Sequence, residues 1–221
     1  MAYWITHLRV ADAVIQKLNL YVNMENYLVG SIATDSGMPV FTDNGKKSYI
    51  PPRAVSHWTD VPSNWDSPIH YSRFYNAYVS NETDLDKKSF YLGYFVHLLT
   101  DMLWIELISR PVIESFSSHD DYALCGRSRA RQDWMENEQI YLQNNPDFRP
   151  LKTLQSIQSF ENVYLDYFPP EAIQVKIGQV IDTYKDSSVD AAKVHPYVSF
   201  ERYEQAVDVI IRLIIANLLS R

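Results

Sequence analysis

The chain has 221 residues, of which 46% are hydrophobic and 21% charged, as is typical of a globular protein long enough to bury a sizeable core. Its net charge of −7 offers no basic surface for a phosphate backbone, so nucleic acid is not the expected partner. The single cysteine, Cys125, excludes an internal disulfide and suits a reducing compartment. These features predict one domain over residues 1–221, located in the cytoplasm.

The N-terminal stretch "MAYWITHLRVADAVI" predicts an amphipathic helix over residues 3–19, with Trp4 and His7 on its apolar face. Charges lie inside this stretch, so it does not look like a signal peptide. The longest apolar run, "AVDVIIRLIIANLL" at 206–219, is too short for a membrane span and carries Asp208 and Arg212. We therefore expect a buried terminal helix and no transmembrane segment.

The remaining elements follow in chain order. A short helix over 23–33 ends at the turn signal "TDSGMP", and the proline-containing stretch 37–67 is expected to be a long ordered loop. Helices are predicted over 68–80 and 86–109, with Pro111 ending the second, and residues 115–129 are expected to loop out. Further helices are predicted over 131–144, 151–166, 170–185 and 199–219. No strand alternation is evident, so the predicted fold is a single all-α, multi-helix bundle.

The segment 90–104, "FYLGYFVHLLTDMLW", is apolar and aromatic yet contains His97 and Asp101 four positions apart. Positions four apart share one face of a helix, so the imidazole and the carboxylate can converge on one point. A buried carboxylate without compensation would cost several kcal/mol. Two interpretations remain open: the pair binds a metal, or Asp101 orients a core histidine through a hydrogen bond.

Three other residues bear on that choice. His7 lies on the apolar face of the first helix, Asp35 follows an apolar helix in "IATDSG", and His57 lies in "SHW" within the proline-bounded loop. Each alone has an ordinary structural explanation, as a core histidine, a turn aspartate or a loop histidine. Together with the pair they supply three histidines and two aspartates, a set that fits zinc, with manganese or iron as alternatives.

The order of His7, "GSIATDSG", "SHW" and "GYFVHLLTDMLW" resembles the bacterial zinc-dependent phospholipase C family, over about residues 1–105. That family shares an all-helical fold with fungal single-strand nucleases. The resemblance implies that Asp35, His57, His97 and Asp101 bind one zinc, and that His7 binds a second with Asp101 as the bridge. It also places Asp35 beside the water that the zinc activates, as the catalytic residue.

The sequence departs from the family pattern in two places. Secreted members bind zinc through the amino group of an N-terminal tryptophan, whereas Trp4 here follows Met-Ala-Tyr and has only an amide nitrogen. The further histidines and the His-x-x-x-Glu element of a third site are also missing between residues 102 and 150. His119, Asp133 and Glu136 are the candidates to replace them, and one or two ions per chain are expected.

The resemblance and the ligand set predict a zinc-dependent hydrolase that cleaves a phosphoester bond, phosphodiester or phosphomonoester, by a metal-activated water. A small phosphoester is the expected substrate, and the aromatic candidates for stacking on it are Trp4, Trp58, Tyr94 and Trp104. The alternative is a non-catalytic helical protein in which the metal, or a His–Asp hydrogen-bonded remnant of the site, braces the fold. An all-α module that binds no metal is a third possibility.

Overall fold

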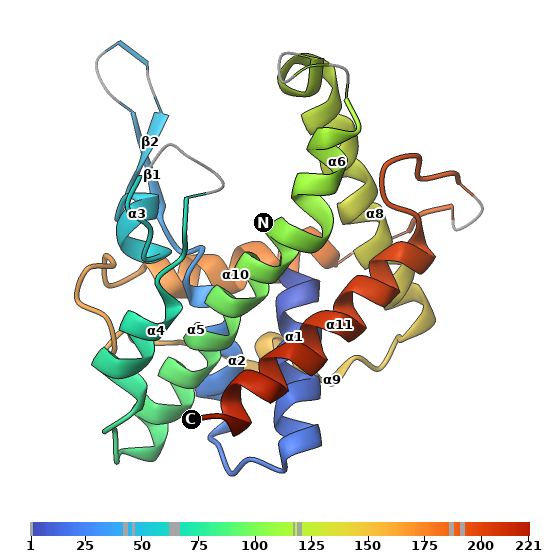
Figure 1. Ribbon diagram of the computed structural model, residues 1–221. Coiled ribbons are helices and arrows are strands. Elements are labelled where there is room, and N and C mark those ends of the chain that lie inside the picture. Colours follow the sequence, from blue (N-terminus) through green and yellow to red (C-terminus); the bar gives the residue numbers. More distant parts are fainter. Residues whose placement is uncertain are drawn as a thin grey trace.

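The protein is described by a computed structural model, which covers residues 2–41, 44–45, 47–61, 67–116, 118, 121–185, 188–190 and 193–221. It is an assembly of helices with one small hairpin, so the predicted all-α fold is confirmed (Figure 1). The principal helices are α1 (Trp4–Leu18), α2 (Met24–Ala33), α5 (Leu85–Trp104), α8 (Arg127–Asn144), α9 (Arg149–Ser156), α10 (Ala172–Tyr184) and α11 (Phe200–Leu219).

Helix α5 lies at the centre of the fold, packed against α1, α2 and α11 (Figure 1). Its start is defined by Asp84, whose carboxylate accepts a hydrogen bond from the backbone N–H of Lys87, and α2 starts at Asn23 in the same way. Nearly every residue of α5 from Ser89 to Asp101 is buried. The packing of three helices around α5 explains why its sequence is apolar on all sides.

Two glycines allow α2 and α5 to cross closely. A Cβ atom added to Gly30 would lie 2.1 Å from the carbonyl oxygen of Phe90, and one added to Gly93 would lie 2.0 Å from that of Tyr27. No side chain fits either position without moving a helix backbone. The two helix backbones therefore lie close enough for a side chain of one helix to hydrogen-bond to the backbone of the other. This close approach helps to position a residue of the site described below.

Pro111 does not end the central helix as predicted. The helix passes through the π-helical turn η2 (Ile105–Ser109) into α6 (Arg110–Glu114), and Pro111 lies in the first turn of α6. Proline is tolerated in the first turn of a helix because an N–H group there would have no partner within that helix. The wider π turn before Pro111 shifts the helical hydrogen-bond register. The proline is therefore accommodated by a local change of helix type.

The stretch predicted as a long ordered loop contains regular structure. Strands β1 (Met38–Phe41) and β2 (Lys47–Ile50) form an antiparallel hairpin with Met38 opposite Ile50, followed by the short helix α3 (Arg53–Ser56). All four residues of β2 are exposed, as are alternate residues of β1. This hairpin buries little of either face, and one of its strands contains a proline. Its sequence therefore lacks the alternation of apolar and polar residues by which strands are predicted.

Smaller boundaries also differ from expectation. The helix predicted over 68–80 is present as α4 (Tyr71–Phe74) and the π turn η1 (Tyr75–Val79). Within the predicted loop 115–129, the π turn η3 (Tyr122–Gly126) leads into α8, which begins at Arg127. The helix predicted over 151–166 ends at Ser156, because the following chain bonds to side chains instead, as when the N–H of Phe160 donates to Gln174.

One helical stretch of the described chain, Leu85–Glu114, is long and apolar enough to cross a membrane by composition. Within its most apolar window, 72% is buried inside the protein. Contacts with neighbouring helices therefore account for its apolar character, as in the core helix of a globular protein.

Candidate metal centre

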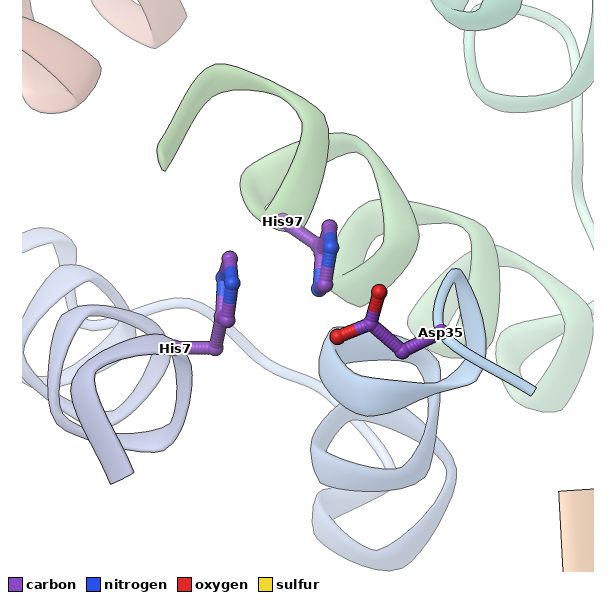
Figure 2. Close-up of side chains that lie close together, drawn as sticks. All are labelled: His7, Asp35 and His97. Atoms are coloured by element: carbon purple, nitrogen blue, oxygen red, sulfur yellow. The ribbon is translucent and has the colours of Figure 1, made fainter. Parts of the chain in front are cut away.

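Five polar side chains from four separate segments meet beside the C-terminal half of α5. His97 and Asp101 come from α5 and His7 from α1, while Asp35 follows the end of α2 and His57 follows the end of α3. Figure 2 shows His7 and His97 side by side, with the carboxylate of Asp35 directed toward His97. All five residues singled out from the sequence are therefore brought together.

Asp101 is the common neighbour of the three histidines. One carboxylate oxygen, Oδ1, lies 3.4 Å from Nε2 of His7, and the other, Oδ2, lies 3.6 Å from Nε2 of His57 and 3.7 Å from Nε2 of His97. The carboxylate of Asp35 approaches the same nitrogen of His57, with Oδ1 3.3 Å from Nε2. Two overlapping groups, His7–Asp35–His97 and His57–His97–Asp101, each have their ligand atoms within 4.8 Å of one another.

Four of these atoms are buried and make no hydrogen bonds within the described protein. Nε2 of His7, His57 and His97 all lack a partner, as does Oδ2 of Asp101. Leaving one buried polar atom unpaired costs about 1–3 kcal/mol, so a cluster of several needs an explanation. Imidazole nitrogens and carboxylate oxygens are a common donor set for zinc, and the residues present therefore fit a bound ion.

The other nitrogen of two histidines is held by its surroundings. Nδ1 of His97 lies 2.8 Å from the carbonyl oxygen of Ser31, which can only accept, so the proton sits on Nδ1 and the lone pair on Nε2 faces the cluster. Nδ1 of His57 lies 2.9 Å from Oγ of Ser56. Such outer contacts orient imidazole rings in metal sites.

His7 and His97 are stacked, with ring centroids 3.6 Å apart and an interplanar angle of 4°. Two protonated imidazoles would repel strongly at this separation, so the stack is compatible with neutral rings. Burial, followed by the proximity of His7, lowers the pKa of His97 to about 3. Burial and the nearby Arg53 likewise lower the pKa of His57.

The two carboxylates are ionised. Burial by itself raises the pKa of Asp35, but the close contact with His57 and the charge interaction with His97 outweigh it, so the pKa lies well below its usual value. Burial opposes the same trend at Asp101, where His7 and His97 lower the pKa. Metal binding requires neutral imidazoles beside ionised carboxylates, and the pKa shifts of His57, His97 and the two aspartates are in that direction.

Access to the cluster differs among its members. The side chains of His7, His97 and Asp101 are fully buried and that of His57 is 5% exposed, whereas that of Asp35 is 14% exposed. Oδ2 of Asp35 accepts a hydrogen bond of 3.0 Å from the indole Nε1 of Trp4, which is itself partly buried. Asp35 therefore forms the edge of the cluster nearest to solvent, and Trp4 holds it there.

The start of α1 is anchored to α8 by Glu138, which sequence reasoning did not identify. The buried carboxylate accepts hydrogen bonds from the backbone N–H groups of Ile5 (3.2 Å) and Thr6 (2.7 Å), from Oγ1 of Thr6, and from the hydroxyl of Tyr184. The first N–H groups of a helix have no partner within the helix, so Glu138 supplies one from a distance. This contact sets the position of the turn that carries His7.

A second missed contact involves the N-terminal segment. The backbone nitrogen of Ala2 is buried and donates a 3.2 Å hydrogen bond to Oδ1 of Asp101, so Ala2, not Trp4, places its backbone nitrogen beside the cluster. Sequence patterns give no signal for such a backbone contact.

The candidates proposed to replace the missing third-site ligands do not join the centre. Asp133 accepts hydrogen bonds from the backbone N–H groups of Tyr197 and Val198, and Glu136 pairs with Lys193 and His195. His119 lies outside the described residues.

Two of the four aromatic candidates are excluded from ligand stacking by burial. Tyr94 packs on Phe74, and Trp104 packs edge-on against Trp134, with neither Tyr94 nor Trp104 exposed to solvent. Trp4 and Trp58 remain partly exposed, and Trp58 lines a hollow of about 330 Å³ next to α3.

Comparison with known proteins gives one match. A family model described as zinc-dependent phospholipase C matches residues 6–159, more than half of the chain and a range that includes all five clustered residues. No curated protein and no solved structure shows a significant match.

Proposed function

This chain belongs to the zinc-dependent phospholipase C family, and from that membership and its buried cluster we propose that it is a zinc-dependent hydrolase of phosphoester bonds. The observation that carries the proposal is the convergence of three imidazole nitrogens and a carboxylate oxygen that have no hydrogen-bond partner in the described protein. A structural histidine normally satisfies both its nitrogens, and three unsatisfied ones facing two carboxylates favour an ion.

Asp35, His57, His97 and Asp101 are proposed to hold one zinc, with His7 and Asp101 available to a second ion. Zinc bound there would supply Lewis-acid stabilisation of a phosphoryl oxygen and would lower the pKa of a water molecule toward about 7. The protein's own contribution is to orient the ligands: Ser31 fixes the tautomer of His97. Glu138 fixes the helix that carries His7.

Asp35 is the proposed catalytic residue. It is the most exposed of the five and its pKa lies well below its usual value, so it is ionised at neutral pH and can position an attacking water or accept its proton. The hydrogen bond from Trp4 occupies Oδ2 and leaves Oδ1 facing His57. The carboxylate is thus held in one orientation before a substrate arrives.

The proposed substrate is a small phosphoester. The net charge of −7 does not favour binding to nucleic acid, whose affinity depends largely on phosphate-backbone contacts. Trp4, which donates to Asp35, and Trp58, which follows His57 in the chain, are both partly exposed and are the aromatic groups available to an organic part of the substrate.

The first experiment is metal analysis by mass spectrometry of protein purified without added metal or chelator. We expect about one to two zinc ions per chain in the wild type and loss of zinc in His97→Gln, with Asp208→Asn, an exposed residue of α11, as the control that keeps it. A content below about a tenth of an equivalent that does not rise on adding zinc or manganese would contradict the proposal.

Activity is then measured on a phosphodiester and a phosphomonoester that release nitrophenol. We expect hydrolysis by the wild type and a loss of at least about 100-fold in Asp35→Asn.

A structural brace is the second candidate function, because three of the five side chains are fully buried. A brace closes the coordination of its ion with protein ligands, whereas a hydrolase keeps a position open. Tightly held zinc without hydrolysis of either substrate would favour the brace.

A further inference from the structure

A lysine on α10, outside the residues matched by the family model, lies beside the exposed edge of the cluster. Lys176 is only 8% exposed, and its ammonium nitrogen Nζ lies 4.4 Å from the ring centroid of Trp4. The same indole donates its N–H to Asp35. Lys176, Trp4 and Asp35 therefore form a continuous contact series from α10 to the centre.

The ammonium is short of partners for a buried cation. Nζ can donate three hydrogen bonds, and one goes to Oε1 of Gln179 at 2.8 Å. Among the described residues Lys176 has no ion pair, and the charge that acts on it is that of Asp35, which raises its pKa against a larger lowering by burial. Contact of the ammonium with the face of the Trp4 ring offsets part of the free-energy cost of burying the charge. The other two N–H groups of the ammonium have no hydrogen-bond acceptor among the described residues.

The net charge of a metal-loaded centre explains what a lysine beside it would contribute. One divalent ion would be balanced by the carboxylates of Asp35 and Asp101, which leaves no net attraction for an anionic ester. The ammonium of Lys176 would make the same centre positive by one charge, which matches the single negative charge of a phosphodiester. With a second ion the charge would suit a phosphomonoester dianion even better.

We propose that Lys176 is a specificity-determining residue that binds a non-bridging phosphoryl oxygen of the substrate, so that this site selects anionic phosphoesters over neutral esters. The inference deepens the proposed function and rests on it for the identity of the reaction. Trp4 acts as the positioning residue, because the face of its indole contacts the ammonium and its N–H group binds Asp35.

The arrangement also accounts for an unusual feature of α10. Its buried face is formed by Ile173, Ile177, Val180 and Tyr184, and Lys176 falls within the same stripe at helical spacing. A lysine on the apolar face of an amphipathic helix is costly unless its charge is used. A methionine there would fill the same space without that cost.

The test uses inorganic phosphate as the probe. Phosphate binding to the full-length, zinc-loaded protein is measured by titration calorimetry for the wild type, Lys176→Met, Lys176→Gln and Lys176→Arg. Lys185→Met, which removes an exposed lysine just after α10, is the matched control. Zinc content and thermal unfolding are measured on every variant.

We expect the Kd for phosphate to rise at least about 10-fold in the methionine and glutamine variants, with unchanged zinc content, and to stay near the wild-type value in Lys185→Met. Arginine at position 176 should recover most of the affinity because it keeps the charge. Lys176→Met should unfold at the same or a higher temperature, since it removes a buried charge.

Phosphate binding within twofold of wild type in either uncharged variant, with zinc retained, would overturn the inference. The two proposals fail separately. Lys176-dependent phosphate binding without ester hydrolysis would leave the anion site and remove the proposed function. Ester hydrolysis with phosphate binding indifferent to Lys176 would do the reverse.

Discussion

Substitution of Gly93 by alanine tests how the fold builds the centre. The added Cβ would lie 2.0 Å from the carbonyl oxygen of Tyr27 and 2.9 Å from the backbone nitrogen of Ser31. An ordinary contact needs at least about 3.4 Å, so α2 and α5 would have to separate by more than about 1 Å. The atoms in the way are backbone atoms of a buried helix and cannot rotate aside as a side chain could.

The cost follows from what that separation breaks. Overpacking a core by one methyl group costs about 1–3 kcal/mol when side chains can adjust, and more when two helix backbones must move. Separation would also stretch the 2.8 Å contact between Nδ1 of His97 and the carbonyl of Ser31, worth about 1 kcal/mol. We therefore expect Gly93→Ala to lose about 3–5 kcal/mol of unfolding free energy and to weaken zinc binding.

Gly178 provides the matched control. It lies within α10, and a Cβ atom placed on it meets nothing within 4 Å. Alanine in place of a helical glycine without a steric conflict stabilises a protein by about 0.4–1 kcal/mol. The same chemical change is thus expected to act in opposite directions at positions 93 and 178.

The assay is urea unfolding of the metal-free protein, followed by zinc titration of each folded variant. If Gly93→Ala unfolded within about 1 kcal/mol of the wild type and bound zinc equally well, the close crossing of α2 and α5 would not position His97. The space at position 93 would then not limit how closely this pair of helices packs.

Three further results are expected. Glu138→Ala should lower the unfolding free energy by about 3–5 kcal/mol in urea melts, because it leaves the N–H groups of Ile5 and Thr6 without their acceptor. A loss below about 1 kcal/mol would contradict the anchoring role of Glu138. In metal-free protein the pKa of His97 is about 3. Below pH ~6.5 the unfolded chain therefore binds a proton that the folded chain does not. The free energy of unfolding should fall by about 1.4 kcal/mol for each pH unit of acidification in that range. Comparison with His97→Gln between pH 7 and 5 isolates this term, and parallel pH curves for the two proteins would refute it. Asp101→Asn should bind zinc at least about 10-fold more weakly by competition with a chelator, because Asp101 adjoins all three histidines, and unchanged affinity would remove it from the ligand set.

Local geometry explains what sequence patterns could predict. His97 and Asp101 share a helix face whatever surrounds them, and side-chain caps such as Asp84 mark where a helix begins. The order of histidines and aspartates along the chain was enough to indicate the family, which the match over residues 6–159 shows. Predictions failed where the outcome depended on surroundings, as at Pro111, which a π turn accommodates, and at the exposed hairpin after Asp35.

The sequence by itself determined the helical class of this protein and the chemistry available to it, because helix periodicity and residue type are local properties. Only the tertiary structure brought His7, Asp35 and His57 to the face of α5, left their facing atoms unpaired, and placed Glu138 and Lys176 around them. Those relations join residues up to more than a hundred positions apart in the chain. They depend on how closely the helices pack, and Gly30 and Gly93 permit the close crossing of α2 and α5 because neither has a side chain.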